Sequence, residues 1–268
     1  MYEILEISLA DTKRMYAYKL KNVFGAGFNI KGFDYPWLIL SHAWKKGENV
    51  LDVGGAYSSL PDWINKTFGC NVWVVDDFGI DSNELFWKRG RTPQEHISAH
   101  PELKFILERL GDPQKSSLPI GYFDVVYSAS VLEHVPGDLL TAVWQHLDLL
   151  LKPGGELLHA VDVPFPTNFG VLGMLKVLAM DWFFPLMPRA LKTKHFRISP
   201  KTYTRLVLKA LKIPNPSLRS LGMLNMAINP DVFTEGYEHG YNRIVKDNAV
   251  NYRFQRESIL LIRLRKTT

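Results

Sequence analysis

Residues 50–61 read VLDVGGAYSSLP, in which a short apolar run ends beside an acid and is followed by Gly54, Gly55 and Ala56. The apolar run predicts a buried strand at 50–53, and the glycines predict a tight turn. In a doubly wound α/β sheet, ligands bind beyond the carboxyl end of the first strand, where the strand order reverses. Glycine there lets the backbone approach a ligand closely, although a simple tight connection would have the same sequence.

A second acid follows at the spacing of a nucleoside-binding protein. The segment VWVVDD predicts another buried strand and places Asp76 at its end, about two dozen residues after the first turn. An aspartate at this place can accept hydrogen bonds from both hydroxyls of a ribose, and it favours a ribose without a 2′-phosphate. The two features together indicate a nucleotide-like cofactor.

Short apolar runs alternate with amphipathic segments along the chain, as is typical of an α/β protein. The predicted strands are 50–53, 72–75, 105–107, 123–127, 156–161 and 258–264, with a further strand near 221–228. Helices are expected at 139–150, before the breakers Lys152-Pro153-Gly154-Gly155, and after Ser199-Pro200. The predicted fold class is α/β, with a doubly wound, seven-stranded, mostly parallel sheet and a helical cap.

Two further landmarks follow in a fixed order. Gly111-Asp112 precedes SSLPIGYFDVVYSASVLEHVP at 116–136, and LLLKPGGELL follows at 149–158. With the glycine turn and the second acid, this order resembles that of class I S-adenosylmethionine-dependent methyltransferases and covers roughly residues 48–163. The resemblance implies a Rossmann-like fold, a methyltransferase activity and S-adenosyl-L-methionine as the cofactor.

The first turn departs from the family pattern of an acid and three alternating glycines. These places hold Asp52, Gly54, Ala56 and Ser58, so small side chains replace two glycines and still permit close backbone approach. The competing interpretation of the fold is a dinucleotide-dependent oxidoreductase, which needs the later glycines to bring a pyrophosphate to a helix N-terminus. The segment AYSSLP and the later landmarks disfavour it.

The resemblance also implies roles for single residues. The cofactor-binding residues expected from it are Asp52, Gly54, Gly55, Ala56, Asp76, Asp77, Asp112 and Ser128. Asp52 and the glycine turn would shape the methionine end, and Asp76 would bind the ribose. Asp77 and Phe78 would line the adenine, whose amino group Asp112 would reach. Ser128 would present its backbone near the transferable methyl.

The chemistry adds candidate catalytic residues. Methyl transfer from a sulfonium is an in-line displacement, so a site must chiefly align the nucleophile, and a neutral histidine can take the proton of a hydroxyl acceptor. His134 follows the fourth predicted strand, and His195 lies in a loop before an amphipathic helix. Both are also compatible with structural or surface roles. His159 and Asp162 lie near the end of the fifth strand, where acceptor-contacting groups often project.

The pair Glu133-His134 is similar to part of a metal site in quinone O-methyltransferases. The preceding glutamate of that pattern is replaced here by Ser130. With one ligand missing, we expect no metal.

The acceptor side is predicted to involve a helical N-terminal cap at 1–47 and an insertion at 165–200 after the fifth strand. The insertion is rich in Leu, Met, Phe and Trp but is interrupted by charges and prolines, so it is not expected to span a membrane. It would form a lid, an interfacial helix or plain packing. No acid lies between Asp181 and Asp231, which makes that stretch basic. It could contact an anionic substrate or a membrane surface.

The 268 residues are read as one domain, 1–268, with a net charge of +5 and the lone Cys70. The chain shows no secretory signal and no disulfide framework, so a cytoplasmic location is expected. No nucleic-acid recognition module is found. The segments FDYPWLIL and AYSSLP loosely resemble methyltransferases that accompany glycan-assembly enzymes.

The predicted function is O-methylation of a small-molecule or glycan-precursor hydroxyl. The acceptor would be a sugar, a phenol or a quinone. The alternatives are a membrane-associated quinone or lipid methyltransferase and a non-catalytic cofactor-binding or scaffold protein.

Overall fold

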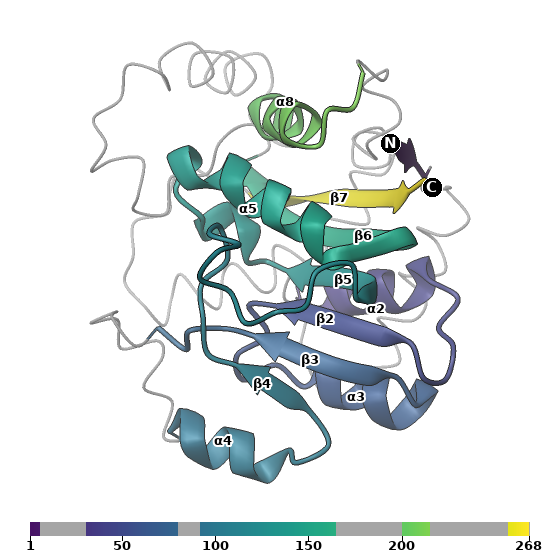
Figure 1. Cartoon of the computed structure of the whole chain (residues 1–268), viewed down its shortest axis with the longest axis vertical. Coiled ribbons are helices and arrows are strands. Elements are labelled where there is room, and N and C mark those ends of the chain that lie inside the picture. The colour runs from purple at the N-terminus through teal and green to yellow at the C-terminus, as the bar shows by residue number, and fades with distance from the viewer. Residues whose placement is uncertain (6–30, 80–91, 165–199, 215–256, 268) are drawn as a thin grey trace.

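The computed structural model describes residues 1–5, 31–79, 92–164, 200–214 and 257–267. They form a seven-stranded sheet with the order β1-β7-β6-β5-β2-β3-β4 (Figure 1). The strands are β1 (Tyr2–Ile4), β2 (Asn49–Val53), β3 (Asn71–Val75), β4 (Lys104–Ile106), β5 (Phe123–Ala129), β6 (Leu151–Pro164) and β7 (Glu257–Lys266). Strands β2 to β6 run parallel, and β7 is antiparallel to β6 and β1. The predicted fold class is confirmed.

Helices cover both faces of the sheet (Figure 1). They are α2 (Lys31–Ser41), α3 (Leu60–Phe68), α4 (Pro93–Ala99), the short 3-10 helix η2 (Leu132–His134), α5 (Gly137–Leu150) and α8 (Pro200–Ala210). α4 begins with a capping box, because Thr92 Oγ1 accepts from the Glu95 amide and the Glu95 carboxylate accepts from the Thr92 amide. None of the helices that the structure describes has the length and apolar character to cross a bilayer.

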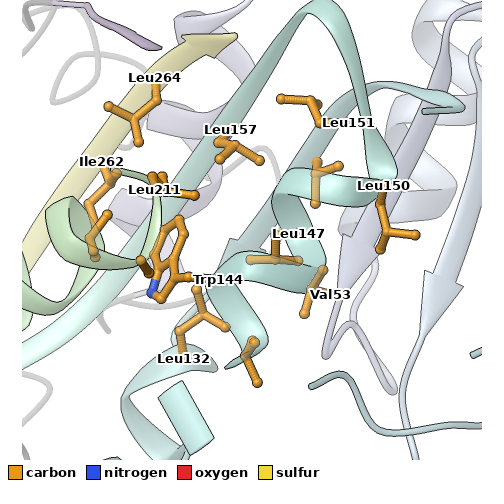
Figure 2. Close-up of a cluster of buried hydrophobic side chains, with 14 of the residues drawn as sticks. Val53, Leu132, Trp144, Leu147, Leu150, Leu151, Leu157, Leu211, Ile262 and Leu264 are labelled. Atoms are coloured by element: carbon orange, nitrogen blue, oxygen red, sulfur yellow. The ribbon is translucent and has the colours of Figure 1, made fainter. Parts of the chain in front are cut away.

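The core has two parts, one on each face of the sheet. On one face, α5 and α8 pack against β5, β6 and β7, and Trp144 lies fully buried among Leu132, Leu211 and Ile262 (Figure 2). On the other face, α2 lies against β5 and β6, and α3 lies against β3. Because parallel strands are buried on both faces, they read as continuous apolar runs in the sequence.

One prediction about the N-terminal lead-in needs correction. The lead-in at 1–47 was expected to be helical, but it begins with β1, which pairs antiparallel with β7 and supplies the seventh strand. Tyr2 and Ile4 pack on the core, which explains this short edge strand. α2 agrees with the helical expectation. The predicted strand at 221–228, the insertion at 165–199 and His195 lie outside the described residues.

The breakers Lys152-Pro153-Gly154-Gly155 follow the end of α5 at Leu150, as expected, but they lie within β6, which begins before the predicted strand at 156–161. A register shift between Phe123 and Val125 accommodates the extra residues. A Cβ on Gly155 would lie 2.9 Å from the carbonyl oxygen of Asp124, so glycine permits this close pairing. The Lys152 ammonium binds the Asp124 carboxylate at 2.9 Å and fastens the bulge to β5.

Candidate functional site

The predicted site residues gather at one edge of the sheet. β2 lies between β3 and β5 and runs parallel to both, so their carboxyl ends lie side by side where the strand order reverses. Asp52 lies in β2, Asp76 directly follows β3, and Ser128 lies near the end of β5. The topology therefore places the first turn and the second acid next to the loop after β5.

The turn after β2 requires glycine because neighbouring side chains leave no room for a Cβ at Gly54 or Gly55. Gly54 has φ +73, and a Cβ there would lie 2.3 Å from Cγ1 of Val131. A Cβ on Gly55 would lie 2.5 Å from Oδ2 of Asp52. The next residue, Ala56, has φ +33, which is uncommon for a residue with a side chain. The turn is thus packed tightly against Val131 and the Asp52 carboxylate.

Asp76 connects this turn to β3. Its Oδ2 accepts from the Ala56 amide at 3.1 Å, and its Oδ1 accepts from the Phe78 amide at 2.5 Å. Burial raises the pKa of the Asp76 carboxyl to about 6, because the charged form is poorly solvated and the two amide bonds offset only part of that cost. A carboxylate has about four acceptor sites, so two amides leave capacity for a further donor.

Asp52 is buried behind the turn. Its Oδ2 accepts from the Tyr127 hydroxyl at 2.9 Å. Burial in the core, with Asp52 close by, raises the pKa of Tyr127 well above its ordinary value, so the hydroxyl remains a donor. The sequence analysis missed Tyr127, whose only signal is a polar atom within the buried strand FDVVYSA.

Asp77 and Phe78 lie in the loop after β3. The Asp77 carboxylate accepts from the Gly79 amide at 2.9 Å and pairs with the Arg109 guanidinium. Phe78 has φ +52 and is buried, with its ring 5.2 Å from that of Tyr57. The sequence analysis did not single out Tyr57 or Arg109 as neighbours of this loop.

Asp112 follows β4 and differs from the other acids because nearly half of its side chain, 46%, is exposed. It pairs with Lys115 at 3.0 Å and accepts from the Gln114 amide. The hydrogen bond from Lys115 lowers the pKa of the Asp112 carboxyl, so it is ionised at neutral pH. The neighbouring Gly111 amide donates to Nδ1 of His146 in α5, which positions the loop.

Ser128 and His159 form a buried pair. The Ser128 hydroxyl lies 2.7 Å from Nδ1 of His159, and both residues are fully buried. Burial lowers the pKa of His159 to about 3, so the ring is neutral. The His159 ring makes a T-shaped contact with the Trp144 ring. The expectation that His159 projects toward an acceptor is therefore wrong. Asp162 lies farther along β6, beyond this pair.

His134 lies after β5 at the same edge of the sheet. Its side chain is half exposed, and its Nε2 lies 3.8 Å from Oε1 of Glu133, whose carboxylate is buried. The 3-10 turn of η2 places the two side chains next to each other. An accessible imidazole therefore lies directly beside a buried carboxylate at this edge of the sheet.

Four carboxylates in this region are buried. They are Asp34, Asp52, Asp76 and Glu133, each at most 8% exposed. The first of them was not predicted from the sequence: Asp34, in α2, accepts from the hydroxyl of Ser130 in the loop after β5 at 2.8 Å. Such a concentration of acids favours a cationic ligand and disfavours an anionic one.

One group of residues elsewhere has the composition of a metal site. Asp62, His100 and Glu102 come within metal-ligand reach of one another. The Lys66 ammonium lies 2.6 Å from the Asp62 carboxylate and 3.7 Å from that of Glu102. The group is therefore already an ion-pair network with its own cation.

Comparisons with known proteins agree with this geometry. A family model described as a methyltransferase domain matches residues 38–210. A Haemonchus contortus phosphoethanolamine N-methyltransferase 2 structure in complex with S-adenosyl-L-methionine is 14% identical, with a TM-score of 0.52, over 96% of this chain and 57% of that one. The chain thus spans little more than half of that protein.

A second similar structure comes from a Haloferax volcanii complex between the Trm112 methyltransferase activator and a protein described as a methyltransferase. It is 13% identical, with a TM-score of 0.50, and the match covers 95% of this chain and 98% of that one. At these identities the two structures show a shared fold. Among curated proteins, none matches the sequence.

Proposed function

The chain belongs to the S-adenosylmethionine-dependent methyltransferases, and we propose that it transfers the methyl group to a hydroxyl oxygen of a small molecule. The observation that supports the sulfonium cofactor most is the set of four buried carboxyl groups at the carboxyl edge of the sheet. A sulfonium cofactor is cationic at its reacting end, and these charges favour it. The same acidic groups would repel the negatively charged pyrophosphate of a dinucleotide.

The residues of the turn suit this cofactor. Asp76 keeps acceptor capacity after binding the Ala56 and Phe78 amides, as a ribose diol requires. We assign the methionine end to the turn Gly54–Ala56 with Asp52 behind it, and the adenine to Asp77, Phe78 and Asp112. Ser128 contributes only backbone, because its hydroxyl is bound to His159.

The bound cofactor supplies an electrophilic methyl group, and the protein must align the acceptor and receive its proton. We assign the proton to His134, whose ring is accessible and adjoins the buried Glu133 carboxylate. That carboxylate would stabilise the imidazolium formed when the acceptor hydroxyl loses its proton. His195, which lies outside the described residues, is the second candidate base.

The first test is calorimetric titration of the purified chain with S-adenosylmethionine, S-adenosylhomocysteine and NAD. We expect micromolar binding of the first two and none of NAD. Asp76→Asn should weaken S-adenosylhomocysteine binding, since an amide is a poorer acceptor and a donor besides. Binding of NAD in preference to the other two would overturn the assignment.

The second test concerns the acceptor. A panel of sugars, phenols and quinones is incubated with labelled cofactor, and the methylated atom is identified by mass spectrometry and NMR. Transfer to oxygen that depends on His134 supports the proposal. Transfer to nitrogen or carbon would contradict the hydroxyl assignment. Cofactor binding without transfer to any acceptor would favour the non-catalytic alternative. Faster transfer to a quinone in anionic vesicles would favour the membrane-associated one.

A further inference from the structure

The start of α2 contacts both loops of the proposed cofactor site. Two consecutive residues make these contacts: Asp34 reaches the loop after β5, and Tyr35 reaches the loop after β2. β2 and β5 are neighbouring strands on either side of the reversal of strand order. α2 therefore touches the two loops that flank this point.

The first contact involves a strained residue. Ser130 has φ +53, a left-handed conformation that costs a residue with a side chain about 1–2 kcal/mol. Its hydroxyl donates to Oδ2 of Asp34 at 2.8 Å, and Asp34 is fully buried. A hydrogen bond to a buried carboxylate is stronger than one between neutral groups, so it can maintain this backbone conformation.

The backbone conformation of Ser130 determines the position of the next residue, Val131, which packs against the glycine turn. Val131 fills the space where Gly54 would carry a Cβ, since its Cγ1 lies 2.3 Å from that position. If Ser130 relaxed, Val131 would shift away from Gly54, and the turn would lose the side chain that packs against it.

The second contact acts on the other end of the turn. The Tyr35 hydroxyl lies 2.9 Å from Oγ of Ser58, and the same oxygen accepts from the Leu60 amide at the start of α3. The Ser58 amide in turn donates to the Gly55 carbonyl at 2.6 Å. Tyr35 thus fastens the segment that closes the turn.

We propose that Asp34 and Tyr35 are positioning residues that hold the two loops in the cofactor-binding conformation, so that the attachment of α2 sets cofactor affinity. The inference rests on the proposed cofactor site and assigns no contact between these residues and the cofactor. It makes α2 part of the binding site through Ser130 and Ser58.

The test compares S-adenosylhomocysteine affinity with amide hydrogen exchange of the ligand-free protein. Ser130→Ala and Asp34→Asn should each raise the dissociation constant about 5- to 20-fold, as expected for loss of a charge-assisted bond. Their double variant should raise it no further than the larger single effect. In Ser130→Ala, exchange should accelerate at residues 54–58 as well as at 130–135. Tyr35→Phe should accelerate exchange at 55–60.

Two controls separate positioning from general stability. Ser130→Gly should bind better than Ser130→Ala, because glycine adopts φ +53 without strain. Trp44→Phe removes the bond from Trp44 Nε1 to the Ile39 carbonyl at the far end of α2. It should lower the melting temperature while leaving the dissociation constant within twofold of wild type.

Unchanged affinity and unchanged exchange in Ser130→Ala and Tyr35→Phe would overturn the inference. A glycine variant that binds no better than the alanine variant would overturn the role of the left-handed backbone. A wild-type protein that binds no S-adenosylhomocysteine would instead overturn the cofactor assignment. The exchange measurements would still show whether α2 positions the loops.

Discussion

Replacing Gly54 by alanine tests whether the turn after β2 is packed as the structure indicates. The substitution has two costs. An L-residue at φ +73 costs about 1–2 kcal/mol in backbone strain. The new Cβ would lie 2.3 Å from Cγ1 of Val131, and such overpacking costs about 1–3 kcal/mol more. We expect Gly54→Ala to lower the free energy of unfolding by about 2–5 kcal/mol.

Urea denaturation measures this loss, and the chain offers a matched control. Gly121 has φ +61, with nothing within 4 Å of its Cβ position, so Gly121→Ala carries the strain alone. Val131→Ala in the Gly54→Ala background removes the clashing atoms and should recover part of the loss. If Gly54→Ala costs no more than Gly121→Ala, Val131 does not pack against the turn, and the reasoning fails.

Three further predictions concern acids and the candidate base. The pKa of Asp76 in the folded protein is raised to about 6, so the folded state binds a proton more readily than the unfolded chain. The contribution of Asp76 to the free energy of unfolding therefore falls as the pH rises from about 4 to 6. If the ionised carboxylate binds the ribose, calorimetric affinity for S-adenosylhomocysteine should rise about tenfold from pH 5 to pH 7, and in Asp76→Asn this dependence should vanish. Tyr127→Phe removes a donor to the buried Asp52 carboxylate and should cost about 1–3 kcal/mol in urea denaturation, whereas an unchanged midpoint would show that the bond contributes nothing. His134→Ala should slow methyl transfer about 10²-fold or more without changing cofactor affinity, and an undiminished rate would assign the proton to another group.

The sheet was predictable because parallel strands buried on both faces leave a signal within each segment. The runs at 50–53, 72–75 and 123–127 are mostly apolar, and each proved to be a strand within one or two residues at either end. β1 was missed because an edge strand of three residues has too few positions to show a period. Its stability comes from pairing with β7 at the opposite end of the chain, which no local pattern reveals.

The candidate site divides in the same way. Asp52, Gly54 and Asp76 occupy strand ends, and any parallel sheet brings such residues together, so their proximity followed from spacing alone. Tyr127 and Asp34 act on residues 75 and 96 positions away, and only the folded topology makes those pairs. For His159, the position near a strand end did not predict the orientation of the side chain. The ring is buried and packs against Trp144.

The structure gives Ser130 a different role from the one that the sequence suggested, because its hydroxyl contacts Asp34. In the sequence it marks a lost carboxylate, since a glutamate occupies that place in the quinone O-methyltransferase pattern. In the structure its hydroxyl donates to Asp34, which no part of that pattern includes. A carboxylate at position 130 would point at the buried carboxylate of Asp34, and like charges at that distance disfavour each other unless a cation lies between them. Asp34 and Ser130 are therefore best understood as one unit, in which the acid of α2 requires a neutral donor after β5.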